Sequence, residues 1–117
     1  MAGWIGVDLD GTLAKYDGWK GVRHIGEPIP LMMDRVKVWI SEGVEVRIFT
    51  ARVSTGEGDR SDYSPAIIAT IIQDWCEKYG LPRLAVTNVK DFGMVQLWDD
   101  RAVQVRANTG EIVGSTT

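Results

Sequence analysis

Residues 4–13 read WIGVDLDGTL and set two carboxylates one residue apart at the end of an apolar run. The apolar run predicts a short buried strand over residues 4–8. Strands are poor in aspartate, so Asp8 and Asp10 mark the place where this strand ends. Two interpretations are open here: the carboxylates cap the turn that follows, as aspartate and glycine often do, or they carry out chemistry.

Helical and extended patterns alternate downstream of this segment. The polar, glycine-rich residues 11–27 are expected to form a loop or a small flap, and a helix is expected from Pro30 to a stop at Gly43. The buried face of that helix is predicted from apolar residues at helical spacing: Met32, Val36, Trp39 and Ile40. Residues 44–49 then alternate apolar and polar side chains, which predicts a second strand.

The second half of the chain continues this alternation. Residues 53–63 are polar and are expected to form an exposed loop. Ser64 and Pro65 supply a capping side chain and a first-turn proline for a helix that ends at Gly80. Its apolar face comprises Ile68, Ile71, Ile72, Trp75 and Tyr79. The remaining predicted elements are strands at 84–87 and 95–98 and a terminal hairpin over 102–113 that turns at 108–110.

Strands that alternate with helices predict an α/β protein with a mainly parallel sheet covered on both faces. In such sheets, ligands bind beyond the carboxyl ends of the strands. The four predicted strands end in, or just before, polar or charged residues: Asp8, Thr50, Lys90, and Asp99 with Asp100. Each residue taken alone has an ordinary explanation as a turn, capping or solvated residue, but together they predict one polar edge of the sheet.

Composition narrows the class of protein. With 117 residues, of which 44% are hydrophobic and 25% charged, the chain is expected to fold as one soluble domain over residues 1–117. A net charge of -3 argues against a long nucleic acid as partner, because such partners require a broad positive field. The N-terminus carries no basic region followed by a long apolar stretch, and no segment approaches ~18 continuous apolar residues. The expected location is the cytoplasm, without a membrane partner.

Any metal site is expected to use oxygen ligands, because the chain has a single cysteine and a single histidine. The carboxylates of Asp8, Asp10, Asp99 and Asp100 would repel one another at a shared edge. That repulsion would raise their pKa values unless Lys90 or a divalent cation lay among them. Oxygen ligands at this density suit Mg2+, and a bound phosphate would complete the charge balance.

Four stretches resemble, in order along the chain, the motifs of the haloacid dehalogenase-like (HAD) phosphohydrolases: DLDGTL at 8–13, IFT at 48–50, Lys90, and LWDD at 97–100. The resemblance spans nearly the whole chain, and its first motif is highly specific. It implies a Rossmann-like three-layer sandwich. Neither 11–27 nor 53–63 is long enough for the cap domain that many members insert. The resemblance therefore implies a capless member with a small flap after the first strand and a C-terminal hairpin.

The resemblance also implies roles for individual residues. Asp8 would be the nucleophile that forms an aspartyl-phosphate, and Asp10 the acid that protonates the leaving oxygen and the base that then activates water. Mg2+ would be held by Asp8, by Asp10 through its backbone carbonyl, and by one of Asp99 or Asp100. The implied phosphate-binding positions are Leu9, Gly11, Thr50, Ala51, Arg52 and Lys90.

Two arginines lie just after the second and fourth motifs. The placement of Arg52 and Arg101 is similar to that in the phosphatase domain of polynucleotide kinases, in which an arginine just after the second motif assists the phosphate. A guanidinium offers a planar fork of donors that suits phosphate. The alternative, in which each arginine pairs with a nearby aspartate, is equally open.

The expected function is Mg2+-dependent hydrolysis of a phosphate monoester, either a small phosphorylated molecule or the phosphorylated end of a larger one. The second aspartate favours an ester, because an alkoxide leaving group needs a proton. Two alternatives of similar fold stay open: a signalling domain that accepts phosphate on aspartate, and a non-catalytic domain that binds phosphate or a protein partner. The residues leave the identity of the ester and self-association of the chain open.

Overall fold

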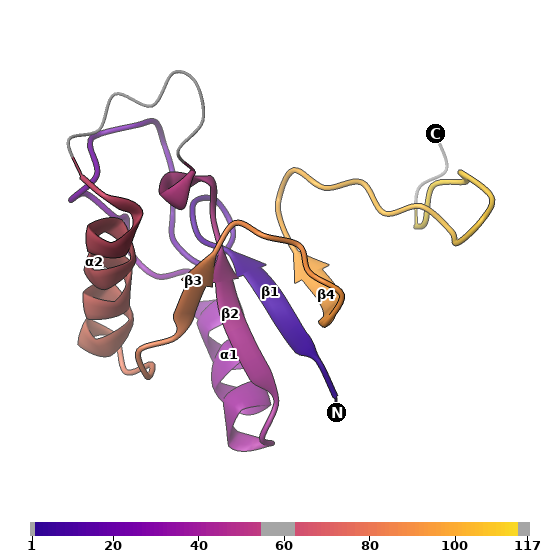
Figure 1. Cartoon of the computed structure of the whole chain (residues 1–117), viewed down its shortest axis with the longest axis horizontal. Helices are drawn as coiled ribbons and strands as arrows, with labels where there is room; N and C mark the ends of the chain where they lie inside the picture. The colour runs from indigo at the N-terminus through magenta and orange to yellow at the C-terminus, as the bar shows by residue number, and fades with distance from the viewer. Residues whose placement is uncertain (1, 55–62, 115–117) are drawn as a thin grey trace.

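The computed structural model describes residues 2–54 and 63–114 as an α/β fold with a four-stranded parallel sheet and two α-helices (Figure 1). The elements in chain order are β1 (Trp4–Asp8), α1 (Pro30–Ser41), β2 (Glu45–Phe49), the 3-10 turn η1 (Ala51–Val53), α2 (Pro65–Lys78), β3 (Ala85–Thr87) and β4 (Met94–Trp98). The predicted strands and helices are therefore confirmed to within a residue or two. Most of the loop predicted at 53–63 lies outside the described residues.

The helix ends follow the signals in the sequence. The Ser64 hydroxyl accepts a hydrogen bond from the Ile67 N–H at 3.3 Å and caps α2, with Pro65 in the first turn. Gly43 and Gly80 follow the two helices with φ of 81° and 86°, a conformation that glycine adopts without steric strain. At both helix ends the backbone thus takes a positive φ, which glycine adopts most easily.

All four strands run parallel in the order β3-β2-β1-β4. Val7 in β1 pairs with Ile48 in β2 on one side and with Trp98 in β4 on the other. This register brings the carboxyl ends of the three strands to one edge. The residues that follow each strand therefore emerge close together, as the sequence predicts.

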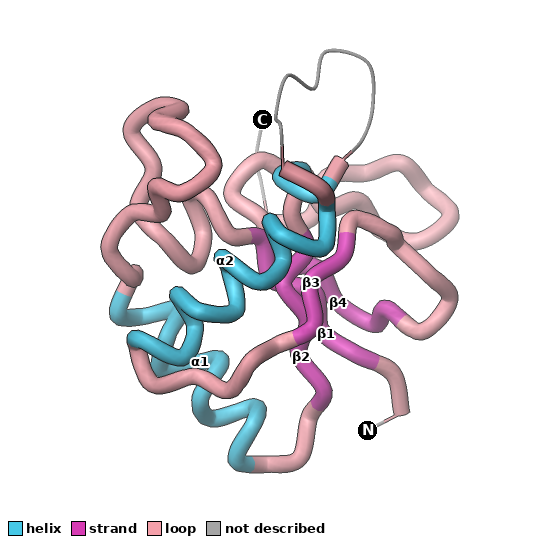
Figure 2. Tube along the Cα trace, turned by 60° about the vertical axis from the view of Figure 1, so that its left-hand side comes forward, coloured by secondary structure: helices cyan, strands magenta, loops and turns pink. Residues whose placement is uncertain are grey.

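The two helices lie on the same face of the sheet (Figure 2). Alternate residues of β1 and β2 point toward them, and the buried cluster includes Ile5, Val7, Val46 and Ile48 from the strands, Met32, Met33 and Val36 from α1, and Ile68, Ile72, Trp75 and Cys76 from α2. One hydrophobic core between helices and sheet thus holds the strand ends in place.

The opposite face carries no helix in the part of the chain that the structure describes, so the predicted three-layer sandwich is wrong on this point. The chain passes from β3 to β4 through residues 88–93, a connection too short for the usual crossover helix (Figure 1). Asp91 on this loop accepts hydrogen bonds from the Trp4 indole N–H at 2.8 Å and from Arg47 at 3.4 Å. The Arg47 guanidinium also lies 4.4 Å from the Trp4 ring centroid. These contacts fix the loop across the sheet.

The C-terminal segment forms the predicted turn but not two paired strands. Asn108 and Gly110 take positive φ values of 64° and 77°, and a single antiparallel bridge joins Val105 to Ile112. Residues 101–112 are all exposed and extend away from the sheet (Figure 1). Without a buried apolar face, this hairpin lacks the packing that longer strand pairs need.

Within residues 2–54 and 63–114, no helix has both the length and the apolar character needed to cross a membrane.

Candidate active site

A cavity of about 470 Å3 opens at the carboxyl edge of the sheet. This volume lies in the usual range for small-molecule sites. The described residues that line it come from the ends of β1, β2 and β4 and from the loop after β1: Asp8, Asp10, Tyr16, Trp19, Val22, Phe49, Thr50, Ala51, Arg52, Ser54, Asp99, Asp100 and Arg101. The predicted polar edge is therefore a concave site.

Three carboxylates gather at the centre of this edge. One oxygen from each of Asp8, Asp99 and Asp100 lies within 4.8 Å of the others, because β1 and β4 are parallel neighbours whose ends align. Burial, and then the charges of Asp99 and Asp100, raise the pKa of Asp8 from 3.8 to about 7. Three carboxylate oxygens at this spacing are donors that could hold a divalent cation.

The Thr12 hydroxyl contacts two of these carboxylates, although Thr12 is not among the predicted site residues. Its oxygen lies 3.3 Å from Asp8 Oδ2 and 3.3 Å from Asp100 Oδ1, and it accepts the Asp100 backbone N–H at 3.0 Å. Thr12 is buried, whereas Asp8 is half-buried and Asp100 is exposed, so these contacts are partly shielded from water. The feature of the sequence that could have indicated this role is the position of Thr12 directly after the glycine of the motif DLDGTL.

A tight turn after β1 brings Thr12 back to the carboxylates. The Leu9 carbonyl accepts the N–H groups of Thr12, Leu13 and Ala14. Gly11 has a φ of 90°, and a Cβ at this position would lie 2.5 Å from Asp100 Oδ2. Only glycine fits there. Leu9 and Gly11 shape the turn and do not appear among the described cavity-lining residues, and the Gly11 N–H is bonded to the Ala14 carbonyl, so their phosphate-binding roles stay predictions.

Arg52 forms a two-pronged ion pair with Asp10. Its Nε donates to Asp10 Oδ2 at 2.7 Å, and its Nη2 donates to Asp10 Oδ1 at 2.9 Å. Nη1 donates to the Val22 carbonyl at 3.0 Å, and Nη2 also donates to the His24 carbonyl at 2.9 Å. Four of the five N–H donors are thus engaged. For Arg52, the structure shows the aspartate pairing that the sequence left as an alternative to phosphate contact.

The same arginine anchors the predicted flap. Its guanidinium lies 4.9 Å from the Trp19 ring centroid and holds the chain at residues 22 and 24. Tyr16 and Trp19 are exposed on their outer sides and line the cavity. The flap therefore forms one wall of the site.

Thr50 and Ala51 follow β2 and also line the cavity. Thr50 is buried, and its hydroxyl accepts the Arg52 backbone N–H at 3.1 Å, which caps η1. Within the described residues the Thr50 hydroxyl donates no hydrogen bond, so its hydrogen is available to a bound ligand. Thr50 and Ala51 thus lie at the cavity, and the phosphate contacts that the resemblance implies for them stay predictions.

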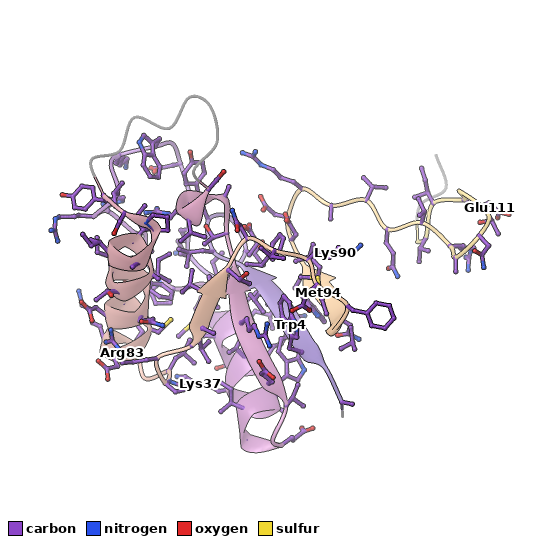
Figure 3. All side chains as sticks on the ribbon, in the orientation of Figure 1. Trp4, Lys37, Arg83, Lys90, Met94 and Glu111 are labelled. Carbon is purple, nitrogen blue, oxygen red and sulfur yellow. The ribbon has the colours of Figure 1, made fainter. Side chains whose placement is uncertain are left out.

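Lys90 is the predicted charged site residue that does not join the others at the cavity. It lies on the loop that crosses the sheet between β3 and β4 (Figure 3). It is exposed and is not among the described residues that line the cavity. Arg101 does line it, directly after the two aspartates that follow β4. The phosphate-binding role of Lys90 stays a prediction that this geometry does not support.

Comparisons with known proteins add information on the fold. No family model matches the chain. No curated protein matches it either. The solved structure of a conserved protein from Bacteroides thetaiotaomicron superposes with a TM-score of 0.60 and 23% sequence identity, over 88% of this chain and 79% of that one. At this identity the likeness shows the α/β architecture alone.

Proposed function

We propose that this protein is a capless member of the HAD superfamily that hydrolyses phosphate monoesters with Mg2+ through an aspartyl-phosphate on Asp8. The observation that carries the proposal is the single cavity that contains Asp8, Asp10 and Thr50 together with Asp99 and Asp100. These residues supply a nucleophile, an acid and base, a hydroxyl donor and metal ligands within one small volume.

In the first step a carboxylate oxygen of Asp8 attacks phosphorus, and the bond from phosphorus to the ester oxygen breaks. A carboxylate needs no proton removed before it attacks, which suits a residue without a neighbouring base. The Thr50 hydroxyl donates to a phosphoryl oxygen, where charge accumulates. Asp10 gives its proton to the leaving alkoxide.

In the second step Asp10 takes a proton from water, and the water oxygen attacks phosphorus. The bond between phosphorus and Asp8 breaks, which releases inorganic phosphate and restores both carboxyl groups. Arg52 orients the ionised Asp10 carboxylate, because its planar fork matches a carboxylate. To act as the acid of the first step, Asp10 carries its proton on an oxygen that has left one prong of this fork. The flap that Arg52 anchors covers one side of the cavity.

Mg2+ fits the donor set at the centre of the cavity, and the residues that would hold it are Asp8, Asp99 and Asp100. When bound, Mg2+ screens the negative charges of the nucleophile and the phosphoryl group from each other. Thr12 orients the ligands by its contacts with Asp8 and Asp100.

A panel of phosphate monoesters assayed for released phosphate tests the proposal. We expect multiple turnovers with Mg2+, loss of activity with a chelator, and loss of activity in Asp8→Asn. Asp91→Asn is the matched control, because Asp91 lies on the sheet-crossing loop and outside the cavity. A single phosphorylation event without turnover would favour the phosphoacceptor alternative. Hydrolysis that survives Asp8→Asn would refute the assigned nucleophile.

A further inference from the structure

A phosphate in this cavity needs a cation from the protein. The carboxylates of Asp8, Asp99 and Asp100 bring three negative charges within 4.8 Å of one another, and a phosphoryl dianion would add two more. A single divalent ion offsets only two of these five charges. An additional positive side chain at the cavity is therefore required for tight phosphate binding.

Two basic side chains line the cavity in the described part of the chain, Arg52 and Arg101. Arg52 is committed elsewhere, because four of its five N–H donors bind Asp10 and two flap carbonyls. Its charge is balanced by Asp10 in a pair whose arginine side chain is only 6% exposed. A phosphate could gain one N–H from Arg52 at most without dismantling the flap anchor.

Lys90, the lysine predicted to bind phosphate, lies on the loop between β3 and β4. The short connection between β3 and β4 carries it over the face of the sheet opposite the helices, and Asp91 fixes that loop to Trp4 and Arg47 (Figure 3). Those two contacts join the loop to residues inside strands, away from the carboxyl ends where Asp8 and Asp99 lie. The lysine is not among the described residues that line the cavity.

Arg101, in contrast to Lys90, lines the cavity. Its backbone N–H donates to Asp99 Oδ1 at 2.8 Å, which forms a tight turn immediately after the metal-ligand candidates. Within residues 2–54 and 63–114, its guanidinium forms no ion pair and no hydrogen bond. We propose, on the basis of the hydrolase function proposed above, that Arg101 is the cation that binds the phosphoryl group of the substrate, in the role that the sequence pattern assigns to Lys90.

Phosphate affinity measured by calorimetry tests this inference without relying on turnover. The probe is inorganic phosphate, titrated with Mg2+ present into wild type and into Arg101→Gln, Arg101→Lys, Lys90→Gln and Arg106→Gln. Arg106 is the matched control, because it is an exposed arginine of the C-terminal segment that does not line the cavity. We expect Arg101→Gln to weaken phosphate binding by about tenfold to a hundredfold, the range for a lost charged hydrogen-bond donor.

Arg101→Lys should recover part of this affinity, since it keeps the charge and loses the planar fork. Lys90→Gln should weaken binding far less than Arg101→Gln, and Arg106→Gln should not weaken it. The KM for an ester should rise in Arg101→Gln in parallel with the loss of phosphate affinity. Equal affinities in wild type and Arg101→Gln, a larger loss in Lys90→Gln, or a wild type that binds no phosphate would each overturn the inference.

These outcomes separate the inference from the function on which it rests. Phosphate binding that depends on Arg101 in a protein that turns over no ester would refute the hydrolase and leave the binding role intact. Rapid hydrolysis by an Arg101→Gln variant with wild-type phosphate affinity would refute the binding role and leave the hydrolase intact.

Discussion

Replacing Asp8 with asparagine is expected to stabilise the metal-free protein at pH 8. Burial and the two neighbouring aspartates raise the pKa of Asp8 from 3.8 to about 7, so its charged form is disfavoured in the folded state. A shift of this size corresponds to about 4 kcal/mol. Because Asp8 is only partly buried, solvent screening reduces this to about 2 kcal/mol. Asparagine keeps the shape of the side chain and removes the charge.

The sign of the pH dependence follows from the two pKa values. Between pH 4 and pH 7 the folded protein keeps a proton on Asp8 that the unfolded chain has released, so rising pH favours unfolding. Above pH 7 Asp8 is ionised in both states, and the folded protein then carries the full cost of the buried charge. The stabilisation in Asp8→Asn should therefore be smaller at pH 5 than at pH 8, where about 2 kcal/mol corresponds to a rise in Tm on the order of 8 °C.

Urea denaturation followed by tryptophan fluorescence, in the presence of a chelator and at several pH values, measures this difference. Asp91→Asn is a control of opposite sign. The hydrogen bond from Trp4 is the main cause that lowers the pKa of Asp91, so the folded state favours its charged form. Loss of that charge should therefore not stabilise the protein. With Mg2+ added, wild type should gain stability and Asp8→Asn should gain less. An advantage of Asp8→Asn that is equal at pH 5 and pH 8 would refute the electrostatic explanation.

Four further substitutions test the site and the core. Asp10→Asn should lower the rate on alkyl phosphates by about a hundredfold or more and the rate on esters with good leaving groups by much less, which steady-state kinetics on both classes would show. Arg52→Gln should lower the free energy of unfolding by about 2 to 3 kcal/mol, because it leaves Asp10 without its partner, and an unchanged urea midpoint would contradict this. Gly11→Ala should weaken Mg2+ binding in calorimetry, since its Cβ would collide with Asp100, and the positive φ should add about 1 kcal/mol of strain. Ile72→Ala should destabilise the fold by about 2 to 5 kcal/mol in urea denaturation, because Ile72 is fully buried in the core.

The order of strands and helices could be predicted because each follows a local pattern. The period of apolar residues in 30–41 and 65–78, and the proline and glycine at their ends, are properties of short segments. The number of layers could not be predicted in the same way. It depends on the path of residues 88–93, which cross the sheet without a helix and are held by Trp4, a residue from the opposite end of the sequence.

The candidate site was predictable to the extent that it lies at strand ends. Asp8, Thr50 and Asp99 meet at the cavity because parallel strands align their carboxyl ends. The position of Lys90, and the choice between the two roles left open for Arg52, were not predictable, since both depend on loops whose direction no local pattern specifies. A motif in the sequence indicates which residue types are present, and only the folded loops determine which of them point into the cavity.

The bond between Thr12 and Asp100 joins residues that are 88 positions apart in the chain. The same holds for the carboxylate cluster, which combines the end of the first strand with the residues that follow the last one. No contiguous fragment that ends before β4 contains the three acidic groups, so the Mg2+ affinity proposed for this cluster is expected to depend on the docking of β4. Calorimetric titration with Mg2+ would therefore serve as a probe of complete folding as well as of the site.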